Sequence, residues 1–230
     1  MRQARAHILV AALTLPMLLV ATHARAQLAF SAAVDSDYRF RGLTLSGGQP
    51  DLRLSLAYDH ASGAYAGLSV IGSRKYERSA GLAADIEYAG FVSQRHGGMA
   101  WEAGLTHTHI RERVVYDYNE VYGGLLSEHF SARLSWSPRY YGRRMQTLYT
   151  DLNAGQHLSS HWRVFGHAGA LTPLTGPQRK GRYDVRIGVA ASLHNYELQL
   201  AWSKSNPLIT YPQRTLDHGQ AVVLTAACYF

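Results

Sequence analysis

The sequence predicts an all-β protein, an antiparallel transmembrane β-barrel of about 12 strands that follows a cleaved signal peptide. Three observations predict this fold class. Many segments alternate apolar with polar or charged residues at the period of two that a β-strand imposes. The links between these segments are alternately short and long. The chain also begins with a secretory leader and has no other long apolar stretch.

The first residues, 1–26, are predicted to be a secretory signal peptide. Two arginines precede an apolar segment, 8–20, and an Ala-Arg-Ala sequence forms a cleavage site before Gln27. The apolar segment is too short for a helix across a bilayer, which takes about 20 residues. We therefore expect residues 27–230 to form one domain, an outer-membrane β-barrel, and we exclude a helical membrane protein.

The segment 28–41 shows the two faces that a barrel strand requires. One face is apolar and the other carries successive charges. A dry protein core would not accept those charges, because unpaired buried charge is costly. A wall with lipid outside and a polar lumen inside accepts both faces. The apolar face holds Leu28, Phe30, Ala32, Val34, Tyr38 and Phe40, and the charged face holds Asp35, Asp37, Arg39 and Arg41.

Further segments along the chain repeat this alternation. In the segment 196–203 the apolar set is complete, and Glu197, Gln199 and Ser203 occupy the opposite face. Such polar faces are predicted to line the lumen. The other regular strands are 51–59, 82–92, 100–110, 130–136, 162–170, 182–193 and 221–230, and the less regular ones are 65–71, 120–126 and 147–154.

The lengths of the links support the same fold. If both termini lie in the periplasm, every second link is short, and the others are longer and richer in basic residues. Bacterial outer-membrane barrels have this arrangement, together with an even number of strands. The short links are 60–63, 93–98, 127–129, 156–161 and 194–195; the long ones are 42–50, 72–80, 111–118, 138–146, 171–181 and 204–219.

The C-terminal segment alternates up to a terminal aromatic residue, Phe230. This ending resembles the signature that outer-membrane barrels present to the barrel assembly machinery, so that machinery is an expected partner. The single cysteine, Cys228, cannot form an internal disulfide.

The charge of the chain argues against nucleic acid as a partner. The formal net charge is +7, and the signal peptide contains three arginines and no acidic residue, so the mature chain carries only +4. Strong electrostatic binding to phosphate backbones needs a larger, clustered basic surface.

The sequence Ser-Asp-Tyr-Arg-Phe-Arg-Gly at 36–42, followed by a hairpin and by Gly-Ala-Tyr-Ala-Gly at 63–67, resembles the TorF family, which carries a porin label. In that family a Ser-Gln pair usually follows shortly after the Arg-Gly, whereas this chain has Leu-Thr-Leu-Ser at 43–46. The resemblance implies an outer-membrane barrel of a Gram-negative bacterium. It implies no particular substrate and no catalytic residue.

The predicted lumen contains charges of both signs. Two functions are compatible with such a lumen. Facing acidic and basic residues can line a porin-like channel for passive diffusion of small polar or charged solutes, or they can pair and close a structural or gated barrel. We expect the channel and keep the closed or gated barrel as the alternative. The expected pore-lining residues are Asp35, Asp37, Arg39, Arg41, Arg53, Asp85, Glu87, Glu102, Arg133, Asp151 and Arg186.

A further alternative is an outer-membrane lipid hydrolase, because His107 and His109 share a lipid-facing strand side near the long loops. Such an enzyme needs a nucleophilic Ser beside the His base. The spacing fixes no Ser there, so we expect no enzyme activity. Two imidazoles alone are a weak metal site, and no metal or cofactor is expected.

The long links carry many basic residues, which favours contact with the phosphates of outer-membrane lipid and lipopolysaccharide. Trp101, Trp136, Trp162 and Trp202 would anchor the barrel at the membrane interfaces. The basic residues are Arg74, Lys75, Arg78, Arg111, Arg113, Arg143, Arg144, Arg179, Lys180 and Lys204.

Overall fold

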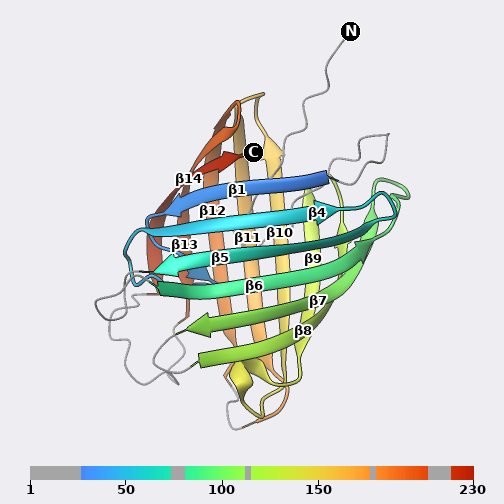
Figure 1. The fold of residues 1–230 in the computed structure, drawn as a ribbon, viewed down its shortest axis with the longest axis vertical. Helices are drawn as coiled ribbons and strands as arrows, with labels where there is room; N and C mark the ends of the chain where they lie inside the picture. The colour runs from blue at the N-terminus through green and yellow to red at the C-terminus, as the bar shows by residue number, and fades with distance from the viewer. Residues whose placement is uncertain (1–26, 74–80, 112–114, 177–179, 207–218) are drawn as a thin grey trace.

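The computed structural model describes residues 27–73, 81–111, 115–176, 180–206 and 219–230. Twelve strands form one closed barrel in which each strand pairs with its neighbours in an antiparallel manner (Figure 1), which confirms the predicted fold class. The predicted signal peptide and several basic residues of the long links lie outside the described residues. The wall strands are β1 (Gln27–Asp35), β4 (Asp51–Asp59), β5 (Ala64–Ser73), β6 (Gly81–Val92), β7 (Ala100–Arg111), β8 (Val115–Leu126), β9 (Phe130–Ser137), β10 (Thr147–His157), β11 (Trp162–Pro173), β12 (Arg182–Leu193), β13 (Tyr196–Ser205) and β14 (Gln220–Tyr229).

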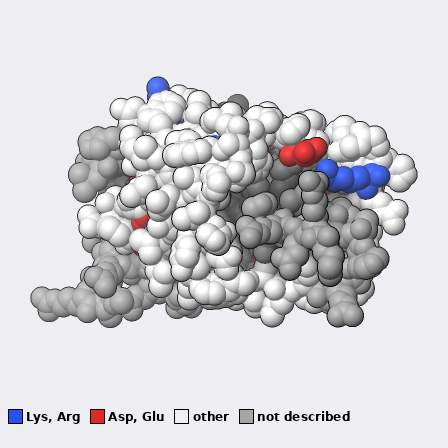
Figure 2. Space-filling model, turned by 90° about the horizontal axis from the view of Figure 1, so that it is seen from above, with Lys and Arg blue, Asp and Glu red and all other residues white. Residues whose placement is uncertain are grey.

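The wall is apolar outside and polar inside along most strands. On β13, exposed and buried residues alternate without interruption: Tyr196, Leu198, Leu200 and Trp202 point outward, and the residues between them point inward. Most described atoms on the face in Figure 2 belong to uncharged residues. A wall of this kind suits a hydrocarbon environment. Among the described residues, no helix is long and apolar enough to cross a membrane.

The barrel closes where the last strand meets the first. β14 pairs with β1 from Ser31 opposite Tyr229 to Asp35 opposite Thr225. The terminal residue extends this seam, since the Phe230 amide donates to the Phe30 carbonyl at 2.9 Å and the two rings lie 5.5 Å apart. The C-terminus therefore lies beside β1 (Figure 1).

Short turns join the strands at one end of the barrel, the end at which β1 starts and β14 finishes; we call it the turn end. The opposite end, which carries the longer links, is the loop end. One link is shorter than the sequence predicted. β7 continues to Arg111 and β8 starts at Val115, so most of the predicted loop 111–118 belongs to strands.

The first strand is shorter than predicted. β1 ends at Asp35, and residues 36–50 leave the wall and form a small two-stranded sheet of β2 (Arg39–Phe40) and β3 (Leu43–Thr44). We call residues 36–50 the inner hairpin. Tyr38 and Phe40 are 2% and 1% exposed, so they are buried inside the barrel rather than facing lipid. The prediction failed because the charged and apolar residues of β2 continue the alternation of β1.

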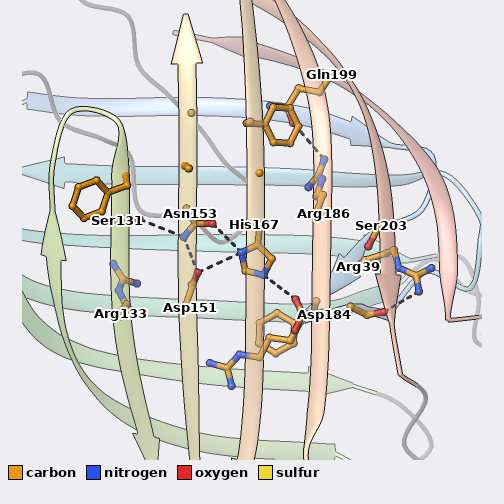
Figure 3. Close-up of a pocket in the computed structure, with 18 of the residues that line it drawn as sticks. Arg39, Ser131, Arg133, Asp151, Asn153, His167, Asp184, Arg186, Gln199 and Ser203 are labelled. Carbon is orange, nitrogen blue, oxygen red and sulfur yellow. Dashed lines mark hydrogen bonds and ion pairs between the residues drawn. The ribbon is translucent and has the colours of Figure 1, made fainter.

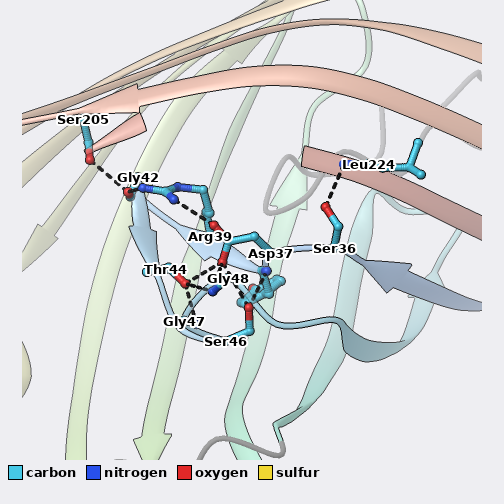
Figure 4. Close-up of polar contacts among 11 residues, drawn as sticks. Ser36, Asp37, Arg39, Gly42, Thr44, Ser46, Gly47, Gly48, Ser205 and Leu224 are labelled. Carbon is cyan, nitrogen blue, oxygen red and sulfur yellow. Dashed lines mark hydrogen bonds and ion pairs between the residues drawn. The ribbon is translucent and has the colours of Figure 1, made fainter. Parts of the chain in front are cut away.

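A network around Asp37 holds the inner hairpin in this compact form (Figure 4). The Asp37 carboxylate accepts hydrogen bonds from the Thr44 hydroxyl, the Ser46 hydroxyl at 3.1 Å and the Gly48 amide at 3.0 Å. Because Asp35 pairs directly with Asp51, the chain needs no long link between β1 and β4. The additional residues are therefore available to fold into the lumen.

A second segment also points inward at the loop end. The link between β9 and β10 contains a short 3-10 helix, η1 (Tyr140–Gly142), and its two tyrosines are buried. They pack with residues of the inner hairpin and with inward side chains of the wall. We call this set the inner cluster. It comprises Tyr38, Phe40, Leu45, Ile71, Ala84, Ile86, Ile110, Tyr118, Tyr140, Tyr141, Met145, Tyr149 and Leu171.

The inner cluster explains a reversal of faces on β6. Ala84 and Ile86 are buried inside the barrel, at 1% and 4% exposed, so Asp85 and Glu87 point outward. The prediction that Asp85 and Glu87 line the pore is therefore wrong. On this strand the lumen side is the apolar one, because it packs against the inner cluster.

Candidate functional site: the lumen

A cavity of about 300 Å³ lies inside the barrel. It extends from Glu128 and His129 near the turn end to residues 39–42 of the inner hairpin at the other side. The strands β9, β10, β11 and β12 supply many of its charged side chains, which converge on the interior from neighbouring positions (Figure 3). The inner hairpin thus forms the boundary of the cavity toward the loop end.

A histidine links two carboxylates on one side of the cavity. His167 Nε2 lies 2.8 Å from Asp184 Oδ1, and His167 Nδ1 lies 3.3 Å from Asp151 Oδ1 (Figure 3). Asn153 completes the network: its Oδ1 lies 2.8 Å from His167 Nδ1, and its Nδ2 donates to Asp151 at 2.7 Å. The network spans β10, β11 and β12, because the register aligns these residues across three adjacent strands.

Most arginines inside the barrel have a carboxylate partner. Arg53 contacts Asp35 at 3.3 Å, and Arg133 contacts Glu102 at 2.8 Å. Further hydrogen bonds fix the acids: the Thr225 hydroxyl donates to Asp35 at 2.6 Å, and the Tyr65 hydroxyl donates to Glu102 at 2.9 Å. Paired and hydrogen-bonded charges of this kind can stay inside the wall at a tolerable desolvation cost.

Arg163 and Arg186 approach the same aromatic ring. Their guanidinium carbons lie 5.1 and 5.5 Å from the centre of the Phe165 ring. Arg163 also contacts Glu197 at 3.4 Å. Arg186 instead donates to the amide oxygen of Gln199 at 3.3 Å, and its Nε has no hydrogen-bond partner. Among the described residues that line the cavity, Arg186 is the arginine without an ion-pair partner.

The inner hairpin contacts opposite sides of the barrel. Arg41 at its tip forms an ion pair with Glu120 of β8, and its guanidinium lies 4.1 Å from the centre of the Tyr149 ring. The neighbouring Gly42 packs against β12 and β13, where a Cβ would come within 2.6 Å of side-chain carbons. The Ser205 hydroxyl donates to the Gly42 carbonyl at 2.9 Å (Figure 4). The hairpin therefore crosses the lumen and is held at its tip.

The structure places the sequence-predicted lumen residues in three groups. Asp35, Asp37, Arg39, Arg41, Arg133, Asp151 and Arg186 line the cavity. Arg53 and Glu102 are buried inside the barrel in ion pairs but are not part of the cavity lining. Asp85 and Glu87 lie on the outer face, as described above.

Sequence reasoning missed several residues of the site. His167, Arg163 and Glu120 were not proposed to line the pore, although His167 and Arg163 lie on inward positions of β11. Asp184 and Glu197 alternate with outward apolar residues in the sequence, which predicts a lumen position for both, and both are buried inside the barrel. The alternation could therefore have placed His167 and Arg163 inside as well. The partners of these residues could not have been found in this way, because the pairing depends on the register between strands.

The outer face of β6–β8 carries a group of polar residues near the loop end. His107 Nδ1 lies 2.8 Å from Asn119 Oδ1, and His109 Nδ1 contacts Asp117. The register aligns Glu87 with His107 and Asp85 with His109. These are imidazoles with polar orienting groups, as a hydrolase would need. However, the described outward residues of β6, β7 and β8 include no serine that could act as a nucleophile.

Metal ligation has no geometric support within the described ranges. They contain no group of three or more His, Cys, Asp or Glu side chains that could hold a metal ion. The tryptophans occupy outward positions: Trp101, Trp136, Trp162 and Trp202 are 38–52% exposed. Such residues suit the interfaces of a membrane.

The sequence matches, over residues 21–225, the model of a family described as "Bacterial protein of unknown function (Gcw_chp)". The chain therefore belongs to this family. The family description does not use the TorF name, and TorF membership remains a prediction. No curated protein matches the sequence.

The fold is similar to those of solved porins. The KdgM porin superposes with a TM-score of 0.52 at 9% sequence identity, over 90% of this chain and 98% of that chain. The NanC porin superposes with a TM-score of 0.57 at 8% identity, over 88% of this chain and 98% of that chain. At these identities the likeness concerns the fold, so the protein has a porin-like barrel.

Proposed function

We propose that the protein is a channel in the outer membrane of a Gram-negative bacterium, through which small polar or charged solutes diffuse passively. The observation that carries the proposal is the cavity inside the closed barrel, which is lined by charged side chains of both signs. The apolar outer surface supports the membrane location, and the porin-like fold supports the channel. Charged and hydrogen-bonding side chains along a passage can replace part of the hydration of a solute.

The inner hairpin and η1 make this channel a narrow or gated one. Together they fill space at the loop end with the tightly packed inner cluster, whose members are all less than 8% exposed. A solute moving between the loop end and the cavity must pass these segments. Gating, which the sequence analysis kept as an alternative, is therefore part of the proposal. We expect conduction to depend on the position of the inner hairpin.

Conductance of the purified, refolded protein in a planar bilayer tests the proposal. The wild type is expected to give discrete conductance steps. A variant that lacks residues 38–47 keeps a five-residue link between Asp35 and Asp51, which is long enough for adjacent antiparallel strands. It is expected to give larger steps, because the inner hairpin is removed while the wall strands remain.

Arg139→Gln serves as the control, because Arg139 is exposed in the link before η1 and its replacement should leave the steps unchanged. Verified insertion of both the wild type and the deletion variant without any conductance would contradict the channel. Equal steps in the two proteins would contradict the role of the inner hairpin.

The proposal includes the contacts expected from the sequence. Basic residues of the loop end would contact lipopolysaccharide and lipid phosphates, and several of them lie outside the described residues. Phe230 would be recognised by the barrel assembly machinery, which its position at the β1–β14 seam supports. Removal of Phe230 should reduce assembly more than secretion.

A further inference from the structure

Charged side chains of both signs line the cavity from β11 and β12. His167, which lies opposite Arg186 in the register of β11 and β12, connects two carboxylates, Asp151 and Asp184. Arg163 and Arg186 both approach Phe165. The two arginines thus meet at Phe165, and the nearby carboxylates Asp151 and Asp184 are engaged by His167.

The carboxylates near Arg186 are already engaged by other groups. Asp35 accepts hydrogen bonds from Arg53 and Thr225. Glu197 accepts hydrogen bonds from Arg163, Ser192 and Gln199, the last at 2.6 Å.

Arg186 therefore has hydrogen-bond donors and a positive charge that could bind an anion. A guanidinium offers five donors in a planar fork that matches a carboxylate. Arg186 uses one nitrogen toward the neutral Gln199 amide, its Nε has no partner, and its side chain contributes to the cavity wall. Leaving such donors unpaired is costly, and a bound carboxylate would remove that cost.

Phe165 adds an apolar surface beside these donors. It is half-buried, lines the cavity and lies between Arg163 on its own strand and Arg186 on the next. A ligand with a flat apolar face next to its carboxylate can pack on this ring while the carboxylate reaches Arg186.

We propose that Arg186, with Arg163 and Phe165, forms a binding site for small organic carboxylates inside the channel. This site deepens the proposed function, on which its biological role rests, by naming the class of solute. The carboxylate bonds to Arg186, Arg163 supplies a second positive charge, and the organic part packs on Phe165. A weak site of this kind holds a solute long enough to select it and still releases it.

Equilibrium dialysis of radiolabelled benzoate against the folded protein in detergent tests the site without any conductance measurement. Benzamide has nearly the same shape as benzoate without the charge and is the matched ligand. Wild type is expected to bind benzoate at one saturable site and to bind benzamide at least about tenfold more weakly. Arg186→Gln is expected to weaken benzoate binding about tenfold or more, and Arg139→Gln to leave it unchanged.

Folding of each variant is checked by heat-modifiable migration. If Arg186→Gln does not fold, Phe165→Leu provides the test, since it keeps both arginines and should weaken benzoate binding several-fold. Equal binding of benzoate and benzamide, or unchanged benzoate affinity in the folded variants, would overturn the site. Binding in dialysis with a silent bilayer would overturn the channel and keep the site, whereas conductance without benzoate binding would do the reverse.

Discussion

Arg41 and Glu120 face each other across the lumen with two parallel hydrogen bonds, in which Arg41 Nη1 and Nη2 donate to Glu120 Oε1 and Oε2 at 2.9 and 2.6 Å. Arg41 lies at the tip of the inner hairpin and Glu120 lies on β8, 79 positions away in the chain. Both side chains are less than 10% exposed. This pair connects a segment that follows β1 to a distant part of the wall, so the position of the inner hairpin depends on it.

Replacement of Glu120 by Gln is expected to lower the free energy of unfolding by about 3 to 5 kcal/mol, because the buried Arg41 charge loses its partner. The same variant is expected to give larger or more variable conductance steps, since the hairpin tip is no longer held. Unfolding midpoints in denaturant and single-channel recordings measure the two effects. Arg139→Gln is the control, because Arg139 is exposed in the link before η1 and does not line the cavity. A stable Glu120→Gln variant with wild-type steps would show that the pair does not position the hairpin.

The two faces of β4 and β12 give a test of the membrane orientation. Leu54 and Ile187 point outward and are 39% and 63% exposed. Ser55 points inward, and its hydroxyl oxygen lies 2.9 Å from that of Ser69. Leu54→Arg and Ile187→Arg are expected to cost about 2 to 4 kcal/mol if these positions meet lipid. Ser55→Arg should cost much less. Unfolding in lipid vesicles measures the difference, and similar costs at all three positions would contradict the assignment of faces.

Much of the wall could be predicted from the sequence, because alternation is a property of single strands. The outward set of β13 and the charged inward positions Arg53, Arg133 and Arg186 follow from it directly. The inner hairpin could not be predicted in this way. Tyr38 and Phe40 alternate with charges as they would in a wall strand, and the alternation does not distinguish lipid from an apolar cluster inside the barrel.

The same reason accounts for Asp85 and Glu87. The rule that polar residues face the lumen holds only where the lumen is polar, and on β6 the inward residues pack against the inner cluster. The network of His167 with Asp151 and Asp184 could not be predicted from the sequence for a different reason. It requires the register of three strands, and no strand encodes that register by itself.

The reversed faces of β6 predict that replacing Glu102 and replacing Glu87 by the same residue have different effects on stability. Glu102 is 2% exposed and bonds Arg133 and Tyr65, whereas Glu87 lies on the outer face. Glu102→Leu is expected to lower the free energy of unfolding by about 2 to 4 kcal/mol, because it leaves the half-buried Arg133 without its ion-pair partner. Glu87→Leu should leave stability unchanged or raise it, since it removes a charge from a lipid-facing wall. Unfolding midpoints of the two variants in denaturant measure the difference. A larger loss of stability for Glu87→Leu than for Glu102→Leu would show that Glu87 faces the lumen.

Substitutions at Arg186 and at Arg53 are expected to have different effects, the first on ion selectivity and the second on stability. Arg186 lines the cavity without an ion-pair partner, so a glutamate in its place would mainly change the charge that a passing ion meets. Arg186→Glu is expected to shift the reversal potential in a salt gradient toward cation selectivity and to cost about 1 kcal/mol of stability, the worth of its one hydrogen bond to Gln199.

Arg53 is different because it bonds Asp35 and is only 6% exposed. Arg53→Glu would place a buried carboxylate beside Asp35 and is expected to lower the free energy of unfolding by about 3 to 5 kcal/mol. Reversal potential and unfolding midpoint, measured on both variants, test the distinction. An unchanged reversal potential for Arg186→Glu, together with a stability loss as large as that of Arg53→Glu, would mean that Arg186 is a structural charge and that ions do not pass it.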